Sequence, residues 1–266
     1  NCSITHLALH PQDNLYLGQT LFDKFIYKFF RVRNFSFKKN LVINQRILKI
    51  INKHNGLISM GKILNLHWKN TFGIQISDNQ IVPLPSFIDI DKNIDKKFNS
   101  KKIIWIGRIV DFKIPAILAM IHFVSDNIEY EFSIVGKGNV KKIKKYIKKF
   151  SLDTKRIHFK GEIAYQDLET AINQHSIGYA MGTSSIELAK YKMPVIVALA
   201  SFDHKIFKNQ ICGGLFFDKP QGCDGSDLLL KSQKLIKTTI SNSIEEIEFD
   251  FDKASQNCYE YAKNNF

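Results

Sequence analysis

Short apolar runs alternate with amphipathic stretches from about Lys101 onward in this 266-residue chain. The runs have the length of buried strands, and the stretches between them repeat apolar residues with the period of a helix. Such alternation predicts an α/β fold, a parallel sheet with helices on both faces. The predicted strands are 103–106, 130–135, 156–159, 177–180, 195–199 and 214–217, and the predicted helices are 115–124, 140–150, 166–173, 184–191 and 227–238.

The first hundred residues show a less regular pattern. Pro83, Pro85 and the polar run 89–100 are typical of an interdomain linker. We therefore expect an N-terminal domain over 1–95 and a second domain over 96–240, followed over 241–266 by an acidic connector (241–252) and a terminal helix (254–264). The strands predicted in the first region are 4–9, 41–43, 57–60 and 80–84, and the helices are 18–30, 45–53 and 62–70.

The net charge is +13, which favours an anionic partner. A preference for lysine codons in an AT-rich genome explains most of this charge, since all but five of the 38 basic residues are lysines. Arginines retained in such a chain are more informative, because guanidinium is a planar group with five N–H donors. They are Arg31, Arg33, Arg46, Arg108 and Arg156. A nucleic-acid partner is disfavoured, because lysine charge alone leaves the glycine turns described below unexplained.

No metal site or disulfide framework is indicated. The cysteines form no C-x-x-C pair and no zinc-type cluster, so we expect free thiols in a reducing cytoplasm. Asp89-Ile90-Asp91 has the spacing of a metal-binding motif, but its polar surroundings favour a solvated loop. No apolar run approaches the roughly 18 residues of a membrane span. The chain begins with Asn, so we expect that upstream sequence is missing. The cysteines are Cys2, Cys212, Cys223 and Cys258.

The segment 181–189 has the composition of a phosphate-binding turn. Gly182 allows a close backbone approach, and the hydroxyl residues Thr183, Ser184 and Ser185 suit the start of a helix whose free N–H groups receive phosphate. Glu187 follows about one turn later, where its carboxylate can accept hydrogen bonds from sugar hydroxyls. An ordinary strand–turn–helix connection with a serine cap explains these residues equally well.

Three further glycine turns follow predicted strands. The first is Gly107-Arg108, with Lys113 at the start of the next helix; the second is Gly136-Lys137-Gly138; the third is Gly161-Glu162. Ligands of open α/β sheets bind outside the carboxyl ends of the strands. The four turns therefore predict one nucleotide-binding crevice.

In order and spacing these turns resemble the donor-binding domain of GT-B glycosyltransferases, in particular the group 1 (family 4-like) enzymes. The matching motifs cover about Lys101 to Ala200. The resemblance implies two Rossmann-like domains, of which the N-terminal, acceptor-side one is incomplete. The motifs are Ile106-Gly107-Arg108 with Lys113, Ile134-Val135-Gly136-Lys137-Gly138, Phe159-Lys160-Gly161, and Gly182 to Glu187 followed by Pro194-Val195-Ile196.

The resemblance also implies roles. The catalytic residues would include Arg108 and Lys113, which neutralise the departing diphosphate. Glu187 would bind the ribose, and the backbone near Gly161 and Glu162 would meet the base. His10, which follows strand 4–9, would contact the sugar or move a proton, although a histidine bonded to backbone is an equally good interpretation. The remaining donor-binding positions are Gly107, Gly136, Gly138, Gly182, Thr183, Ser184 and Ser185.

One position departs from the family pattern. Group 1 enzymes commonly carry a second Glu eight residues before the ribose-binding one, and this chain has Tyr179 there. The turn looks more like the phosphate turn of the N-acetylglucosaminyltransferase that makes lipid II. The departure leaves the sugar and the stereochemical outcome open, and it favours the alternative of a non-catalytic nucleotide- or glycan-binding relative.

The resemblance implies metal-independent transfer of a sugar from a UDP- or GDP-linked donor, with no cofactor, to a glycan or lipid-linked acceptor. The expected setting is surface polysaccharide biosynthesis in a bacterial cytoplasm, at the inner face of the membrane. An apolar stripe within 18–30 suits either docking on an anionic membrane or packing on the protein's own core. Its residues are Phe22, Phe25, Ile26, Phe29 and Phe30.

Overall fold

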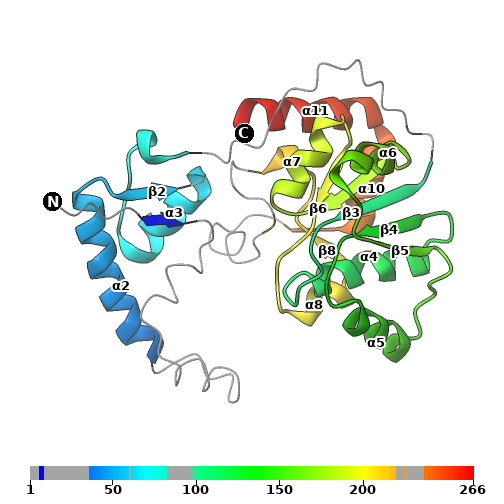
Figure 1. Cartoon of the computed structure of the whole chain (residues 1–266), viewed down its shortest axis with the longest axis horizontal. Coiled ribbons are helices and arrows are strands. Elements are labelled where there is room, and N and C mark those ends of the chain that lie inside the picture. Colours follow the sequence, from blue (N-terminus) through cyan, green and yellow to red (C-terminus); the bar gives the residue numbers. More distant parts are fainter. Residues whose placement is uncertain are drawn as a thin grey trace. The chain divides into compact units, whose positions relative to one another are not determined.

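The computed structural model describes residues 6–8, 36–59, 61–82, 98, 100–219, 225 and 237–266 (Figure 1). The described residues up to 82 belong to one compact unit, and those from 98 onward belong to a second. Several predictions concern positions outside the described residues. These are His10, helix 18–30 with its apolar stripe, the linker with its Asp89-Ile90-Asp91 motif, nearly all of helix 227–238, and the boundary between 95 and 96.

The second unit is built on a five-stranded parallel sheet, as the alternating pattern predicts. The strands lie side by side in the order β5-β4-β3-β6-β7. The chain moves outward from β3 to β5 and then returns to place β6 on the other side of β3. The direction of winding therefore reverses between β3 and β6. The strands are β3 (Lys102–Ile106), β4 (Glu131–Val135), β5 (Ile157–Gly161), β6 (Ile177–Ala180) and β7 (Val195–Val197).

Helices cover both faces of this sheet (Figure 1). On one face lie α4 (Ile114–Asp126), α5 (Val140–Phe150) and α8 (His204–Lys208), and on the other lie α6 (Leu168–Asn173), α7 (Thr183–Lys190) and α11 (Phe251–Asn265). Helix α10 (Ile240–Phe249) packs against α4 and β7. None of the described helices is long and apolar enough to cross a bilayer. Shorter elements are η2 (Tyr165–Asp167), η3 (Phe216–Asp218) and the antiparallel pair β8 (Ile211–Cys212) and β9 (Thr238–Thr239).

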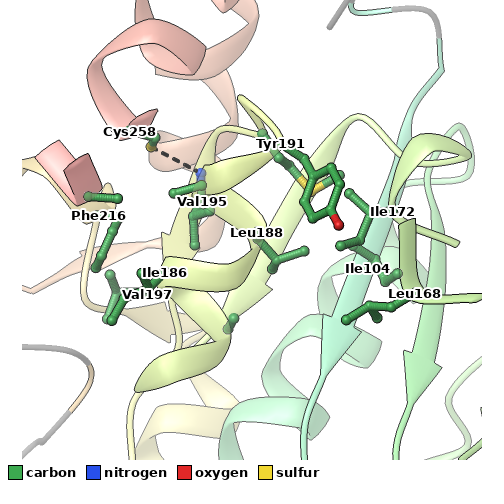
Figure 2. Close-up of a cluster of buried hydrophobic side chains, with 14 of the residues drawn as sticks. Ile104, Leu168, Ile172, Ile186, Leu188, Tyr191, Val195, Val197, Phe216 and Cys258 are labelled. Atoms are coloured by element: carbon green, nitrogen blue, oxygen red, sulfur yellow. Dashed lines mark hydrogen bonds between the residues drawn. The ribbon is translucent and has the colours of Figure 1, made fainter. Parts of the chain in front are cut away.

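An apolar core fixes α7 between the sheet and α11. Figure 2 shows Leu188 of α7 within the same cluster as Ile104 of β3 and Val195 of β7. The Val195 N–H donates to the sulfur of Cys258 on α11, at an N···S distance of 3.3 Å. Burial raises the pKa of this thiol to about 12, so it stays protonated and acts as a packing group. The start of α7 is thereby held in a defined place at the end of β6.

The first unit contains a smaller parallel pair. Strand β1 (His6–Ala8) pairs with β2 (Leu57–Ser59), and helices α2 (Ser36–Lys53) and α3 (Lys62–Phe72) accompany them. A second apolar core includes Trp68, whose side chain is fully buried. The short helix η1 (Asp78–Gln80) leads to Ile81, which forms a single parallel bridge to Ser59.

Two strand predictions in the first unit and one in the second are wrong. Residues 41–43 lie within α2, because this apolar run belongs to the longer helix. Of the predicted strand 80–84, residue 80 ends η1 and only Ile81 forms a bridge. The predicted strand 214–217 is mostly η3, with one antiparallel bridge between Leu215 and Ile196.

The acidic connector predicted over 241–252 is also wrong, since these residues form α10 and the start of α11. Its acidic residues occupy exposed positions, whereas Ile240, Ile244 and Ile247 repeat at helical spacing and are buried. The Thr239 hydroxyl caps the helix by accepting from the Asn242 N–H at 3.2 Å. A charged surface stripe thus concealed an amphipathic helix.

Candidate functional site

The turn after β3 lies beside the start of α7. A Cβ atom placed on Gly107 would lie 3.4 Å from Lys113 Nζ and 3.6 Å from Ser184 Oγ. Lys113 caps the start of α4, and its ammonium lies 5.6 Å from the centre of the Trp105 ring. The structure therefore brings together three predicted site residues that are far apart in the sequence.

The start of α7 is prepared for an anion. Gly182 at the N-cap has φ 66°, and no side chain caps the helix. The first N–H groups of a helix carry a partial positive charge and need acceptors. The Ser185 hydroxyl is fully buried and has no hydrogen-bond partner among the described residues. Phosphate oxygens would satisfy such donors.

Arg108 adds a second cation at this edge. Its side chain is exposed, and within the described part of the chain no hydrogen bond or ion pair holds it. A guanidinium in this state can contact a phosphate without first breaking a protein contact. Arg108, Lys113 and the start of α7 together form what we call the anion site.

The anion site lies at the carboxyl ends of β3 and β6. These two strands are neighbours in the sheet, and the winding direction reverses between them. Loops diverge at such a switch point, which is where open α/β sheets bind their ligands. The topology therefore agrees with the location that the sequence motifs predict.

The turn after β4 supports the turn after β3. A Cβ atom on Gly136 would lie 2.0 Å from the carbonyl oxygen of Gly107, and one on Gly138 would lie 2.1 Å from that of Ile109. The Ile109 N–H donates to the Lys137 carbonyl at 2.8 Å. Close backbone contact between the turns thus requires both glycines. Their contact with a donor stays a prediction.

The turn after β5 continues this ladder. The Gly136 N–H donates to the Gly161 carbonyl at 2.7 Å, and Gly161 has φ 72° with open space around its α-carbon. Glu162 is exposed, and its carboxylate lies 3.5 Å from Lys137 Nζ. The predicted role of these residues in binding a base is consistent with this exposure and stays a prediction.

Glu187 has two partners that the motifs do not include. Lys190 Nζ lies 2.7 Å from Glu187 Oε2, and the Tyr165 hydroxyl donates to Oε1 at 3.3 Å. Burial, together with the Glu187 and Glu169 charges, raises the pKa of the adjacent Tyr191. The three-residue spacing of Glu187 and Lys190 is a helical pair that sequence reasoning could have found. Nothing in the sequence links Tyr165 to Glu187.

Tyr179, which stands in the place of a family glutamate, belongs to the core. Its side chain is fully buried in β6, with its ring 5.9 Å from that of Trp105. Its hydroxyl donates to the Ala116 carbonyl of α4 at 3.2 Å. Burial raises the pKa of this phenol well above its ordinary value. A carboxylate at this position would be buried in the sheet rather than presented to a ligand.

We therefore expect that Tyr179→Phe lowers stability by about 1 kcal/mol, the net value of one hydrogen bond, and leaves function intact. Tyr179→Glu should cost several kcal/mol, because it buries a carboxyl group without a designed partner. Denaturant unfolding of both variants measures these differences. A folded Tyr179→Phe protein that has lost donor binding or turnover would contradict the structural role.

His10 lies outside the described residues, and its role stays a prediction. Among the residues that the structure describes, no group of three or more His, Cys, Asp or Glu side chains could hold a metal ion. Cys212 and Cys258 are both buried free thiols.

Comparison with known proteins identifies the fold. No family model and no curated protein matches the chain. Two structures of S. aureus TarM, one a variant in complex with fondaparinux, α-GlcNAc-glycerol and UDP, align with a TM-score of 0.51 at 20–21% identity. They cover 85–86% of this chain but 43% of TarM.

Sucrose-phosphate synthase from Thermosynechococcus elongatus aligns over 100% of this chain and 64% of its own, with a TM-score of 0.59 and 14% identity. The chain thus spans less than two thirds of each of these proteins. It has the fold of GT-B glycosyltransferases, which confirms the predicted fold. The narrower assignment to the group 1 family stays a prediction.

Proposed function

We propose that this chain is part of a glycosyltransferase that moves a sugar from a nucleoside-diphosphate donor to a hydroxyl acceptor. The observation that carries the proposal is the anion site, where two cations and an uncapped helix start meet at the switch point of the sheet. The fold supports it, and TarM, which shares the fold, was crystallised with UDP.

The chemistry matches the groups present. Transfer breaks the bond between the anomeric carbon and the donor phosphate oxygen, and forms a bond from that carbon to the acceptor oxygen. The departing diphosphate gains negative charge, which Arg108, Lys113 and the α7 N–H groups can stabilise. The proton of the acceptor hydroxyl passes to a base, a role for which we propose His10. Because the protein supplies these cations, we propose that the transfer needs no divalent metal.

The acceptor and setting extend this proposal. We assign a glycan or lipid-linked acceptor and a place in bacterial surface polysaccharide biosynthesis, at the inner face of the cytoplasmic membrane. The support is the family resemblance of the donor motifs, since fold alone carries no substrate.

Donor binding is the direct test. We expect UDP or GDP, or one of their sugars, to raise the melting temperature by several degrees at 100 times Kd, where binding contributes about 2.7 kcal/mol. The shift should persist in EDTA. Inorganic pyrophosphate is the control, because lysine charge alone would bind it equally well. A shift that is the same for pyrophosphate and every nucleotide would contradict a donor site.

Turnover separates the enzyme from the non-catalytic alternative. Release of nucleoside diphosphate from the bound sugar nucleotide, with water or an added glycan as acceptor, should accompany binding. Specific binding without any release under these conditions would favour a nucleotide-binding relative over a transferase.

A further inference from the structure

A buried ion pair holds the carboxylate that we assign to the donor ribose. Lys190 Nζ lies 2.7 Å from Glu187 Oε2, and the Lys190 side chain is only 6% exposed. Tyr165, from η2, donates its hydroxyl to the other oxygen at 3.3 Å. Each oxygen of Glu187 therefore has one donor, and two different elements supply these donors.

The burial of Lys190 exceeds what helix stability requires. A solvent-exposed Glu–Lys pair at this spacing supports a helix with little loss of hydration. An ammonium group in a stretch where Leu188 and Ala189 are also buried loses most of its water and must be paired. An apolar side chain would avoid this cost, as the two preceding residues do. The pair therefore has a purpose other than stapling α7.

The Glu187 carboxylate retains capacity for a ligand. An ionised carboxylate accepts about four hydrogen bonds, two on each oxygen. Lys190 and Tyr165 use one on each side, so one remains on each oxygen. Two acceptors on one rigid plane are what the vicinal hydroxyls of a ribose require. The Glu187 side chain is 19% exposed, so solvent reaches it.

We infer that Lys190 and Tyr165 are positioning residues that hold Glu187 in the orientation that binds the 2′- and 3′-hydroxyls of a ribonucleotide donor. The inference rests on the proposed function, since Glu187 has a ribose to bind only if the anion site takes a nucleotide. A carboxylate fixed in advance binds a diol without the loss of side-chain entropy that ordering it would require. The cluster thus selects ribonucleotides over deoxyribonucleotides.

Calorimetric titration of the whole chain with UDP, GDP and their 2′-deoxy forms tests this inference. The wild type should prefer the ribonucleotide. In Lys190→Met, ribonucleotide binding should weaken about 10-fold while 2′-deoxynucleotide binding stays unchanged. Glu187→Gln should give the same loss, and the double variant no further loss. Lys148→Met, which changes an exposed lysine of α5, is the matched control and should bind like the wild type.

Tyr165→Phe provides a second variant that preserves the fold, because the Tyr165 side chain is 75% exposed. It should reduce the preference for ribose about threefold, and it decides the matter if Lys190→Met does not fold. Equal weakening of both nucleotides, or no change, in the folded variants would overturn the inference. A wild type that binds nucleotides without preferring ribose would overturn it as well. A wild type that binds no nucleotide would refute the proposed function itself.

Discussion

Replacing Arg108 with alanine is expected to lower turnover about 100- to 1,000-fold while the protein keeps its fold. The guanidinium is exposed beside the turn after β3, and no ion pair or hydrogen bond with another described residue holds it. Its loss therefore takes little from the folded state. It does remove a charged donor from the departing diphosphate, whose charge is greatest in the transition state. Steady-state kcat and KM for the sugar nucleotide, with a melting curve as the fold check, measure the effect.

Two variants serve as controls for Arg108. Arg108→Lys keeps the charge but loses the planar pair of donors, so its turnover should fall between those of the wild type and Arg108→Ala. Lys148→Ala removes an exposed cation of α5 and should leave turnover unchanged. Turnover of Arg108→Ala equal to that of the wild type would remove Arg108 from the site.

The largest loss of stability is expected for Gly136→Ala. Its Cβ atom would lie 2.0 Å from the Gly107 carbonyl oxygen, and Gly136 has φ 145°, which side chains rarely adopt. Both turns would have to move apart at the anion site. We expect a destabilisation of about 3–5 kcal/mol and a fall in melting temperature of about 10 °C. Denaturant unfolding gives the free energy, and donor titration shows whether the site is lost with it.

Gly161→Ala is the matched control for this clash. Gly161 has φ 72°, but a Cβ atom there meets nothing within 4 Å. Only the strain of the left-handed conformation remains, which costs about 1–2 kcal/mol. If Gly161→Ala proved as destabilising as Gly136→Ala, backbone strain rather than contact between the turns would explain both glycines.

Local patterns predicted the second unit well where burial repeats at a regular period. The apolar runs at β3 and β6 and the helical repeats in α5 and α7 lie within a few residues of their predicted places. The same reasoning failed for α10, because its acidic residues dominate the composition of the segment. What makes α10 a helix is the burial of Ile240, Ile244 and Ile247 against the rest of the unit.

The site was predictable in part. A glycine followed by a cation or by hydroxyl residues after a buried strand indicates an anion-binding turn, and the Gly107 and Gly182 turns were found in this way. Lys190 and Tyr165 were missed as partners of Glu187. Tyr179 was interpreted as a ligand position, although it lies in the core, because a motif records spacing and not the side of the sheet.

The order of the strands and glycine turns along the chain follows from the sequence by itself, since burial period and backbone freedom are local properties. Tertiary structure alone decided that β3 and β6 are neighbours, so that Lys113 and Ser184 meet at Gly107. It also decided that Gly136 serves the packing of two turns. These results depend on contacts between residues distant in sequence, and a sheet acquires such contacts only when its strands pair.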